Sequence, residues 1–284
     1  MAGAYQANHL LGLIGAPIAH SASPAMHEAA GEALGLRCRY HLIEVAAAGA
    51  QRLRTMLEGV RTLTFSGVNV TYPYKVAVLP LLDELDPSAA RVGAVNTVAV
   101  RDERLIGFNT DCSGFRRGVR REIGDVAGQT IALIGAGGVG KAIGVALAES
   151  GVGRLRIVDR DPPRAVELAA ALKEHCNASA CRTAEQALDG AQGLINATAV
   201  GMLPNRDTPA PFHLLRGDLW VADAVYQPLW TPLLLAARDK GSRVMTGREL
   251  AIDQAMDAFQ IFTGKEPPRA AMAEAFDRVI AARQ

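Results

Sequence analysis

A glycine-rich hexapeptide in the middle of the chain is the segment whose residue types point most directly to chemistry. Gly135-Ala-Gly-Gly-Val-Gly140 follows the apolar, strand-like run 130–134 without an intervening loop. Gly135 permits a tight turn from strand to helix, Gly137 lets the backbone approach a pyrophosphate, and Gly140 allows the helix to pack closely on the strand. The spacing predicts a dinucleotide-binding turn, and a glycine-rich connection in another α/β protein is the alternative.

The elements around this turn agree with a dinucleotide site. A helix-like stretch, 141–150, comes next, and its N-terminus would offer N–H groups and a partial positive charge to phosphates. A second apolar run, 154–158, ends in Asp159. A carboxylate there can accept hydrogen bonds from the ribose 2′-hydroxyl of NAD and would repel the 2′-phosphate of NADP. Arg160 favours a phosphate or stacks on the adenine edge. NAD is therefore the preferred cofactor, and NADP is the alternative.

Polar segments in the front part of the chain suggest where a substrate binds. The first, 17–24, directly follows a predicted strand; the second, 69–75, lies at the end of the third predicted strand; the third combines 93–97 with 107–111. Ligands of parallel sheets lie outside the carboxyl ends of the strands. Together the segments supply hydroxyls, amides, one ammonium and one carboxylate, a set suited to a small polyhydroxylated acid.

The elements that position these residues alternate between strands and helices, so the fold class is α/β. In the front third we predict strands at 10–14, 39–45 and 65–70 and helices at 24–34 and 50–59, with Ser23 as N-cap of the first helix. This rhythm predicts a parallel sheet covered by helices. We then expect helices at 75–82 and 87–92, a hairpin formed by 96–100 and 105–108, and a helix at 111–122.

The second half continues as β/α units that together form a Rossmann dinucleotide-binding domain. Strands are expected at 193–196, 219–223 and 243–245, followed by helices at 249–262 and 269–282. We predict a substrate-binding α/β domain over 1–110, completed by the C-terminal helices of 248–284, and a cofactor domain over 111–247. The last helix is expected to pack back on the front domain.

Length and composition fit two domains and exclude several classes of function. The chain has 284 residues, 49% hydrophobic residues and a formal net charge of +1, so nothing indicates a nucleic acid or membrane partner. The first six residues lack the features of a secretion signal, and the cytoplasm is the expected compartment. Cys176 and Cys181, with His175, match no usual zinc spacing, so no metal is expected.

Beyond these patterns, the chain resembles the shikimate dehydrogenase family over nearly its whole length. The matching motifs, in chain order, are HSxSPxxH at 20–27, NVTxPxK at 69–75, GAVNT at 93–97, NTD at 109–111, GAGGVG at 135–140, NATxxGM at 196–202, DxVYxPxxTPLL at 223–234 and QAMDAF at 254–259. The resemblance implies a reversible oxidation of shikimate to 3-dehydroshikimate with NAD or NADP.

The resemblance also implies residue roles. Lys75 and Asp111 would flank the hydroxyl that is oxidised and act as the acid–base pair. The substrate contacts would come from Ser21, Ser23, Thr71, Asn96, Tyr226 and Gln254. The cofactor contacts would come from Gly135, Ala136, Gly137, Gly138, Val139, Asp159, Arg160, Thr198, Ala224, Gly247 and Leu250. Taken without the family, Ser21 and Ser23 suit a turn and a cap, Lys75 suits a solvated surface, and Asp111 suits a helix start; His20 and His27 receive no chemical role.

Two departures from the family pattern leave substrate and cofactor open. Biosynthetic NADP enzymes of the family commonly carry an Asn-Arg-Thr-like segment where this chain has Asp159-Arg160-Asp161, and charged residues occupy 248 and 249. Shikimate is the first substrate, and quinate or an aminoshikimate-type analogue is the second. A metabolite-binding paralogue without turnover is the remaining alternative. The protein is expected to be a monomer or a homodimer.

Overall fold

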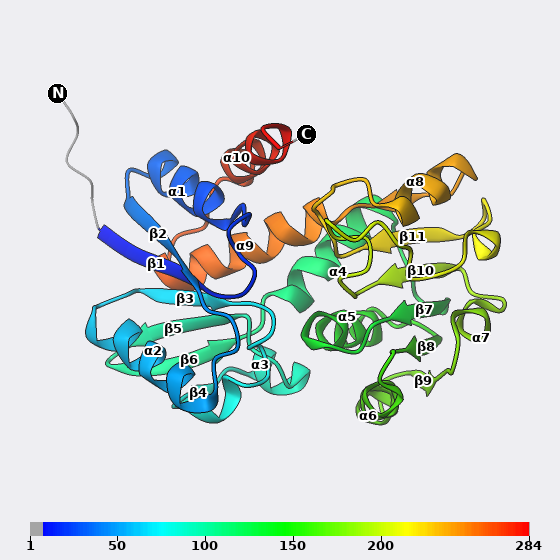
Figure 1. Ribbon diagram of the computed structural model, residues 1–284, viewed down its shortest axis with the longest axis horizontal. Helices are drawn as coiled ribbons and strands as arrows, with labels where there is room; N and C mark the ends of the chain where they lie inside the picture. Colours follow the sequence, from blue (N-terminus) through cyan, green and yellow to red (C-terminus); the bar gives the residue numbers. More distant parts are fainter. Residues whose placement is uncertain (1–7, 284) are drawn as a thin grey trace. The chain divides into compact units, whose positions relative to one another are not determined.

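The computed structural model of the protein describes residues 8–283 (Figure 1). The first six residues, which we predicted not to be a secretion signal, lie outside this range. The chain divides into two compact units, one that ends at Thr110 and resumes at Ile252, and one that runs from Asp111 to Ala251. The sequence-based prediction puts the two crossings after 110 and after 247.

The sheet of the first unit is mixed, with parallel pairs toward both edges and two antiparallel pairs between them. Its order is β2-β1-β3-β5-β6-β4. The strands are β1 (Asn8–Gly15), β2 (Arg37–Glu44), β3 (Gly67–Val70), β4 (Glu84–Leu85), β5 (Thr97–Arg101) and β6 (Arg104–Phe108). The predicted parallel arrangement is confirmed for β1, β2 and β3. The predicted hairpin is also confirmed, because β5 and β6 pair antiparallel around Asp102 and Glu103.

Helices cover both faces of this sheet. They are α1 (Ser23–Ala33), α2 (Ala50–Thr62), α3 (Pro87–Val92), the part of α9 (Gly247–Thr263) beyond residue 251, and α10 (Arg269–Ala281). Side chains alternate along β1, so Ile14 joins a core with Leu53 of α2 while Leu13 joins a core with Phe262 of α9. α10 packs against α1, as predicted.

Two predictions about this unit are wrong. Ser23 is not a cap: the N-cap of α1 is Ala22, which makes no side-chain cap hydrogen bond, and Ser23 is the first helical residue. The segment 75–82 is not a regular helix and contains only a 3₁₀ turn, η1 (Leu79–Leu81). The carbonyl oxygen of Lys75 accepts a hydrogen bond from the N–H of Val95 at 2.7 Å, so it does not serve the first turn of a helix.

The second unit is an all-parallel sheet, as expected for the glycine-rich half. Its order is β12-β11-β10-β7-β8-β9. The strands are β7 (Thr130–Ile134), β8 (Arg154–Val158), β9 (Asn177–Ala180), β10 (Gly193–Asn196), β11 (Trp220–Asp223) and β12 (Val244–Met245). The helices are α4 (Asp111–Glu122), α5 (Gly138–Glu149), α6 (Pro162–Leu172), α7 (Ala184–Leu188) and α8 (Pro232–Asp239), with a 3₁₀ turn, η2 (Phe212–Leu214).

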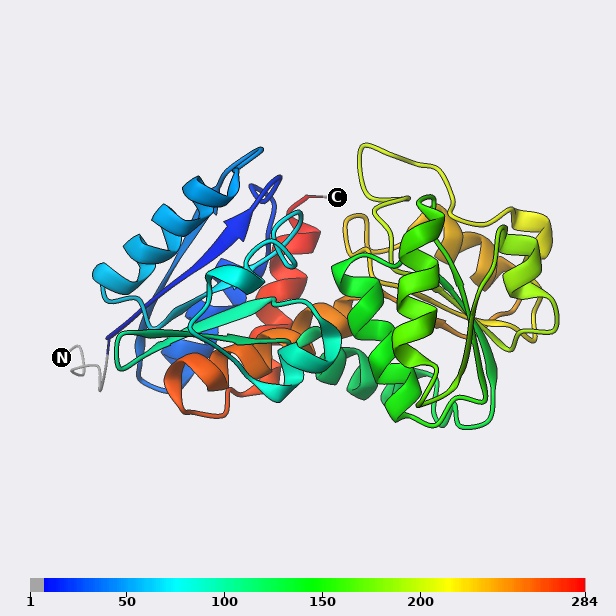
Figure 2. The ribbon, with the colours of Figure 1, turned by 90° about the horizontal axis from the view of Figure 1, so that it is seen from below.

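Helices lie on both sides of this second sheet (Figure 2). On one face, Leu188 of α7 and Leu233 of α8 pack with Ala132 and Val221 of the strands. No helix of the described residues is both long enough and apolar enough to cross a bilayer.

Candidate active site

The strand order of the second unit reverses between β7 and β10, which are neighbours in the sheet. The segments 135–140 and 197–201 follow the carboxyl ends of these two strands. Ligands of open α/β sheets bind outside such a reversal point. The topology therefore brings the glycine-rich turn and the NATxxGM motif to one edge of one sheet.

The glycines of the turn allow close backbone contacts at two positions and leave open space at a third. Gly135 has a φ of +106°, and a Cβ there would lie 2.8 Å from the carbonyl carbon of Ala197. A Cβ at Gly140 would overlap the carbonyl oxygen of Gly135. At Gly137, in contrast, a Cβ would meet nothing within 4 Å among the described residues. α5 begins at Gly138 without a side-chain cap from the described residues, so its first N–H groups suit a phosphate.

Asp159 lies directly beside this turn. Its Oδ2 atom accepts a hydrogen bond from the N–H of Ala136 at 2.7 Å, and its Oδ1 atom accepts one from the N–H of Asp161 at 2.9 Å. Asp161 forms an ion pair with Arg164 at 3.1 Å. Arg160 is exposed. The structure thus brings Asp159 and the glycine-rich turn together and puts negative charge next to it.

A buried hydrogen-bond network joins the ends of β10 and β11. Asn196 donates from Nδ2 to Oδ1 of Asp223 at 2.9 Å and accepts at Oδ1 from the hydroxyl of Thr198 at 2.7 Å. Asp223 also accepts from the N–H of Val225 at 2.9 Å and from the hydroxyl of Thr231 at 2.8 Å. Burial raises the pKa of Asp223 to about 7, although the hydrogen bonds from Val225, Thr231 and Asn196 oppose the shift.

Sequence reasoning assigned no role to Asn196, Asp223 or Thr231, although all three stand in quoted motifs. Only the structure shows that they form one network, which fixes the loop that carries Thr198. An acidic residue at the end of an apolar strand, with a threonine eight positions later, was the available signal.

Three further predicted cofactor residues lie in the same part of the second unit. The N–H of Ala224 donates to the carbonyl oxygen of Asn196 at 2.9 Å. A Cβ at Gly247 would lie 2.8 Å from the carbonyl oxygen of Ala224, which explains why a glycine begins α9. Leu250 is buried one turn further along. Tyr226, predicted as a substrate residue, belongs to this unit and is half-buried after β11.

In the first unit, Asn96 is the centre of the predicted substrate residues. It is 3% exposed, and its Nδ2 donates to the hydroxyl oxygen of Thr110 at 2.9 Å. Its Oδ1 accepts from the N–H of Thr110 at 2.9 Å and from the hydroxyl of Thr97 at 3.0 Å. The hydroxyl of Thr110 also lies 3.5 Å from Oε1 of Gln254. The structure therefore brings Asn96 and Gln254 together through Thr110.

The other predicted substrate residues follow β1 and β3. The hydroxyl of Ser21 donates to that of Ser23 at 3.1 Å. Thr71 follows β3, and its N–H donates to the carbonyl oxygen of Ile14 at 2.9 Å. A Cβ at Gly15 would overlap the methyl group of Thr71, so these two loops are in close contact.

Lys75 and Asp111, the predicted acid–base pair, belong to different units. Lys75 is half-buried in the first unit, and its carbonyl oxygen is bound by Val95. Asp111 is 5% exposed and begins α4 as the first residue of the second unit. Convergence of the two side chains stays a prediction.

His27, to which we gave no chemical role, is enclosed by aromatic rings. It is 1% exposed, its ring centroid is 4.8 Å from that of Tyr40, and it is 6.0 Å from those of Phe259 and Phe262. Among the described residues neither ring nitrogen has a hydrogen-bond partner. Burial lowers the pKa of His27 to about 3, so the ring is neutral.

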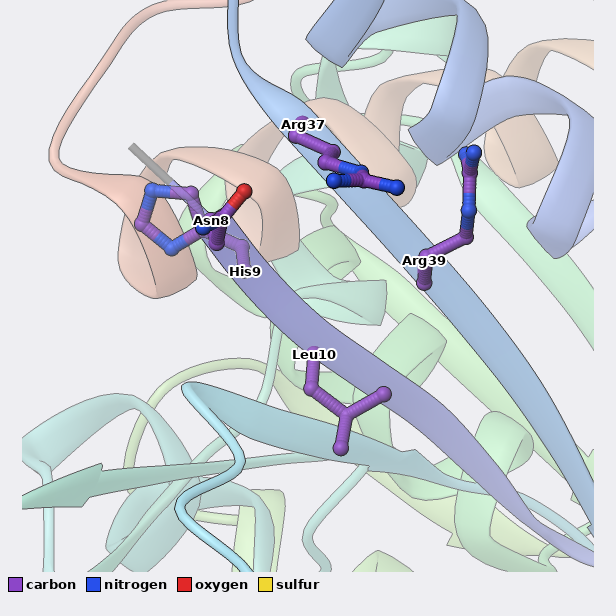
Figure 3. A pocket seen from close by; sticks show the side chains of 5 residues that line it. All are labelled: Asn8, His9, Leu10, Arg37 and Arg39. Carbon is purple, nitrogen blue, oxygen red and sulfur yellow. The ribbon is translucent and has the colours of Figure 1, made fainter. Parts of the chain in front are cut away.

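A pocket in the first unit lies away from the predicted substrate residues. Its volume is about 250 Å³, and it is lined by Asn8, His9, Leu10, Arg37 and Arg39 (Figure 3). These residues stand at the starts of β1 and β2. The predicted substrate residues that follow strands stand at the opposite, carboxyl ends. Within residues 8–283, no three His, Cys, Asp or Glu side chains are grouped so that they could hold a metal ion.

The fold and the turn geometry define an α/β protein with a dinucleotide-binding type of unit. Three family models match the chain. The model of the shikimate dehydrogenase substrate binding domain matches residues 13–98, that of shikimate / quinate 5-dehydrogenase matches 118–203, and that of the shikimate 5'-dehydrogenase C-terminal domain matches 247–275.

Individual relatives agree along most of the chain. A quinate/shikimate dehydrogenase (NAD(+)) of Corynebacterium efficiens is 44% identical over 266 residues, which cover 91% of this chain and 94% of that protein. A shikimate dehydrogenase (NADP(+)) of Streptomyces avermitilis is 40% identical over 269 residues, or 92% of each. The solved quinate dehydrogenase of Corynebacterium glutamicum in complex with NAD has a TM-score of 0.88 and 41% identity, and covers 96% of this chain and 100% of that one.

A structure of shikimate 5-dehydrogenase from Thermus thermophilus in complex with NADP(H) and shikimate has a TM-score of 0.85 and 37% identity over 95% of this chain and 99% of that one. The chain therefore belongs to the shikimate dehydrogenase family, whose members oxidise a CH–OH group with NAD or NADP.

Proposed function

We propose that this chain oxidises shikimate reversibly to 3-dehydroshikimate and prefers NAD to NADP. In this proposal the first unit holds the substrate and the second holds the cofactor. Bound NAD supplies the acceptor for the hydride that leaves the ring carbon. Quinate, or an aminoshikimate-type analogue, is the second candidate substrate.

The position of the Asp159 carboxylate carries the cofactor preference. Its hydrogen bond with the N–H of Ala136 keeps it next to the turn that would meet the pyrophosphate. At that place it can accept hydrogen bonds from a ribose 2′-hydroxyl, and its charge would repel a 2′-phosphate. Arg160 is exposed beside it and would stack on the adenine edge.

Lys75 and Asp111 are proposed to handle the proton of the oxidised hydroxyl. A positioned lysine side chain can exchange a proton with a substrate hydroxyl, and a neighbouring carboxylate can orient it. Within the first unit, Val95 binds the carbonyl of Lys75, and the adjacent Asn96 binds Thr110, the residue before Asp111. This local geometry supports the pairing, because the backbone of Lys75 and the side chain of Thr110, the residue before Asp111, are bound to neighbouring positions of the same loop.

The remaining polar residues are proposed to hold the ring. Ser21 and Ser23, whose hydroxyls are in contact, would bind the carboxylate. Thr71, Asn96 and Gln254 would bind ring hydroxyls, and Tyr226 would complete the contacts from the second unit.

A grid of two substrates and two cofactors tests this proposal. Steady-state kcat/KM would be measured for shikimate and quinate, each with NAD and NADP. We expect the highest value for shikimate with NAD. A higher value for quinate would support the second candidate, and binding of shikimate without turnover would support a non-catalytic paralogue.

Single substitutions test the roles proposed for Asp159 in cofactor preference and for Lys75 in turnover. Asp159→Asn should shift the ratio of kcat/KM for NADP to that for NAD by about tenfold toward NADP, because a repulsive charge is lost. Asp218→Asn, at an exposed ion pair of the same unit, is the control and should leave the ratio unchanged. Lys75→Ala should lower kcat by ~10²–10⁴-fold while calorimetry still detects shikimate binding.

A further inference from the structure

A chain of hydrogen-bonded, buried side chains in the first unit runs from β2, at one edge of the sheet, to Asn96, the residue before β5. It begins at Tyr40 on β2, whose hydroxyl donates to Oδ1 of Asn69 on β3 at 2.8 Å. Asn69 in turn donates from Nδ2 to the hydroxyl oxygen of Thr97 at 3.0 Å. The hydroxyl of Thr97 donates to Oδ1 of Asn96 at 3.0 Å. All four residues are buried.

The strand register explains how this chain of bonds arises. Asn69 of β3 pairs with Thr97 of β5, and Asn69 also pairs with Leu13 of β1, the strand between it and β2. Neighbouring strands are about 4.8 Å apart. Polar side chains on adjacent strands are therefore within hydrogen-bonding reach, and Tyr40 is long enough to span from β2.

Each bond in the chain has one direction only. The backbone carbonyl of Asn96 can only accept, so the NH₂ group of Asn69 must face it and Thr97, and the amide oxygen of Asn69 accepts from the phenol of Tyr40. The second hydrogen of that NH₂ group is used by the carbonyl oxygen of Asn96 at 3.2 Å. Because Thr97 accepts from Asn69, its own hydrogen goes to Oδ1 of Asn96.

The amide of Asn96 is thereby fixed in orientation. Its oxygen accepts from the hydroxyl of Thr97 and from the backbone N–H of Thr110, which can only donate, and the hydroxyl of Thr110 lies 3.3 Å from the same oxygen. Its NH₂ group uses one hydrogen on the hydroxyl oxygen of Thr110, and no acceptor for the other is found within the described part of the chain. Asn96 can therefore offer a ligand an N–H donor but no free lone pair.

We propose that Tyr40, Asn69 and Thr97 are positioning residues that orient the Asn96 amide so that it donates to an acceptor oxygen of the substrate ring. This inference rests on the proposed function, in which Asn96 binds a ring hydroxyl. It adds that the hydroxyl oxygen must act as acceptor at Asn96, so the hydrogen of that hydroxyl must go elsewhere. An analogue with an amino group there, protonated to ammonium, has no lone pair for Asn96 and binds poorly.

Thr97 is the position at which the chain of bonds is best interrupted. Thr97→Val keeps the shape and removes the hydroxyl, whereas Thr97→Ser keeps the hydroxyl. We expect Thr97→Val to raise KM for shikimate about tenfold and Thr97→Ser to stay within about twofold. KM for NAD should stay unchanged in both. An equal KM for shikimate in the wild type and in Thr97→Val would overturn the proposal.

A double-mutant cycle separates positioning from general stability. In an Asn96→Ala background, Thr97→Val should have no further effect on KM for shikimate, because it acts through Asn96. Tyr40→Phe should behave in the same way, with a shift of about threefold in the wild-type background. Tyr74→Phe is the matched control, since within residues 8–283 its buried hydroxyl bonds to the backbone of Val45 and Ala48 alone. Equal effects of Thr97→Val in both backgrounds would contradict the mechanism.

A measurement without substrate keeps this test apart from the test of function. The ¹⁵N side-chain amide signals of Asn96 can be identified by their loss in Asn96→Ala. Their hydrogen exchange should be at least about tenfold faster in Thr97→Val than in the wild type or Thr97→Ser. Unchanged exchange counts against the positioning chain, whereas a wild type that neither binds nor oxidises shikimate counts against the proposed function.

Discussion

His27 should make the first unit sensitive to acid, and replacing it with leucine should remove that sensitivity. The ring is fully buried among Tyr40, Phe259 and Phe262, and its pKa is lowered from 6.5 to about 3. The unfolded chain therefore binds a proton between these two values when the folded chain does not. Stability from this group is present above pH 6.5 and is lost as the pH falls toward 3.

The size of the stability change follows from the pH range between the two pKa values of His27. Each pH unit between the two pKa values costs about 1.4 kcal/mol of unfolding free energy. Between pH 7.5 and pH 5 the wild type should lose about 2 kcal/mol through His27 alone. His27→Leu has no titrating ring, so its stability relative to the wild type should improve by about 2 kcal/mol over that range. Any packing difference between the two side chains is the same at both pH values and cancels.

Urea unfolding at the two pH values measures this difference. Both tryptophans, Trp220 and Trp230, lie in the second unit, so their fluorescence reports that unit while circular dichroism reports both. If the units unfold separately, only the transition without a fluorescence change should respond to His27→Leu. His41→Gln, at an exposed histidine of the first unit, is the control. A free-energy difference between His27→Leu and wild type that is equal at pH 7.5 and pH 5 would refute the reasoning.

Two further predictions concern the second unit. Gly140→Ala should lower the unfolding free energy by ~1–3 kcal/mol, because its Cβ would overlap the carbonyl of Gly135. Gly137→Ala should leave stability unchanged and weaken NAD binding, because a Cβ there meets no described atom within 4 Å. Thermal unfolding and NAD titration separate the two effects, and equal stability losses would contradict the packing argument. The raised pKa of Asp223 makes the folded state bind a proton more tightly than the unfolded state, so the unfolding free energy of the wild type should rise by about 2–3 kcal/mol through this group as the pH falls from 8 to 5. Asp223→Asn should lack this rise. A pH-independent difference between the two proteins in urea unfolding would contradict the prediction.

Local signals predicted the elements that contain the chemistry. The bounds of β7, β8, β10 and α3 agree with the sequence-based ranges, because glycines, prolines and apolar runs mark them within a few residues. Three helices of the described residues, α6, α7 and α8, were not predicted, although the sequences of α7 and α8 contain a helix-start signal that the structure confirms. Thr183 caps α7 by accepting from Gln186, and Thr231 caps α8 by accepting from Leu234.

The remaining features depend on partners that are distant in sequence. The segment 75–82 has a helical composition, but Val95 binds the carbonyl of Lys75 and a regular helix does not form. The same holds for Tyr40 and Asn69, which are 29 positions apart and meet only because β2, β1 and β3 are neighbours. A single sequence predicts residue types at a site more readily than the buried bonds that orient them.

The interrupted first unit has a consequence for synthesis on the ribosome. All strands of the second unit lie between Asp111 and Ala251, so the chain can complete that sheet before Ile252 leaves the exit tunnel. The front sheet must keep Leu13 and its neighbours uncovered until Phe262 leaves the exit tunnel. The later-made half of this enzyme is therefore expected to fold first, the reverse of the usual order in which domains emerge, and the nascent front sheet is the part that most needs a chaperone.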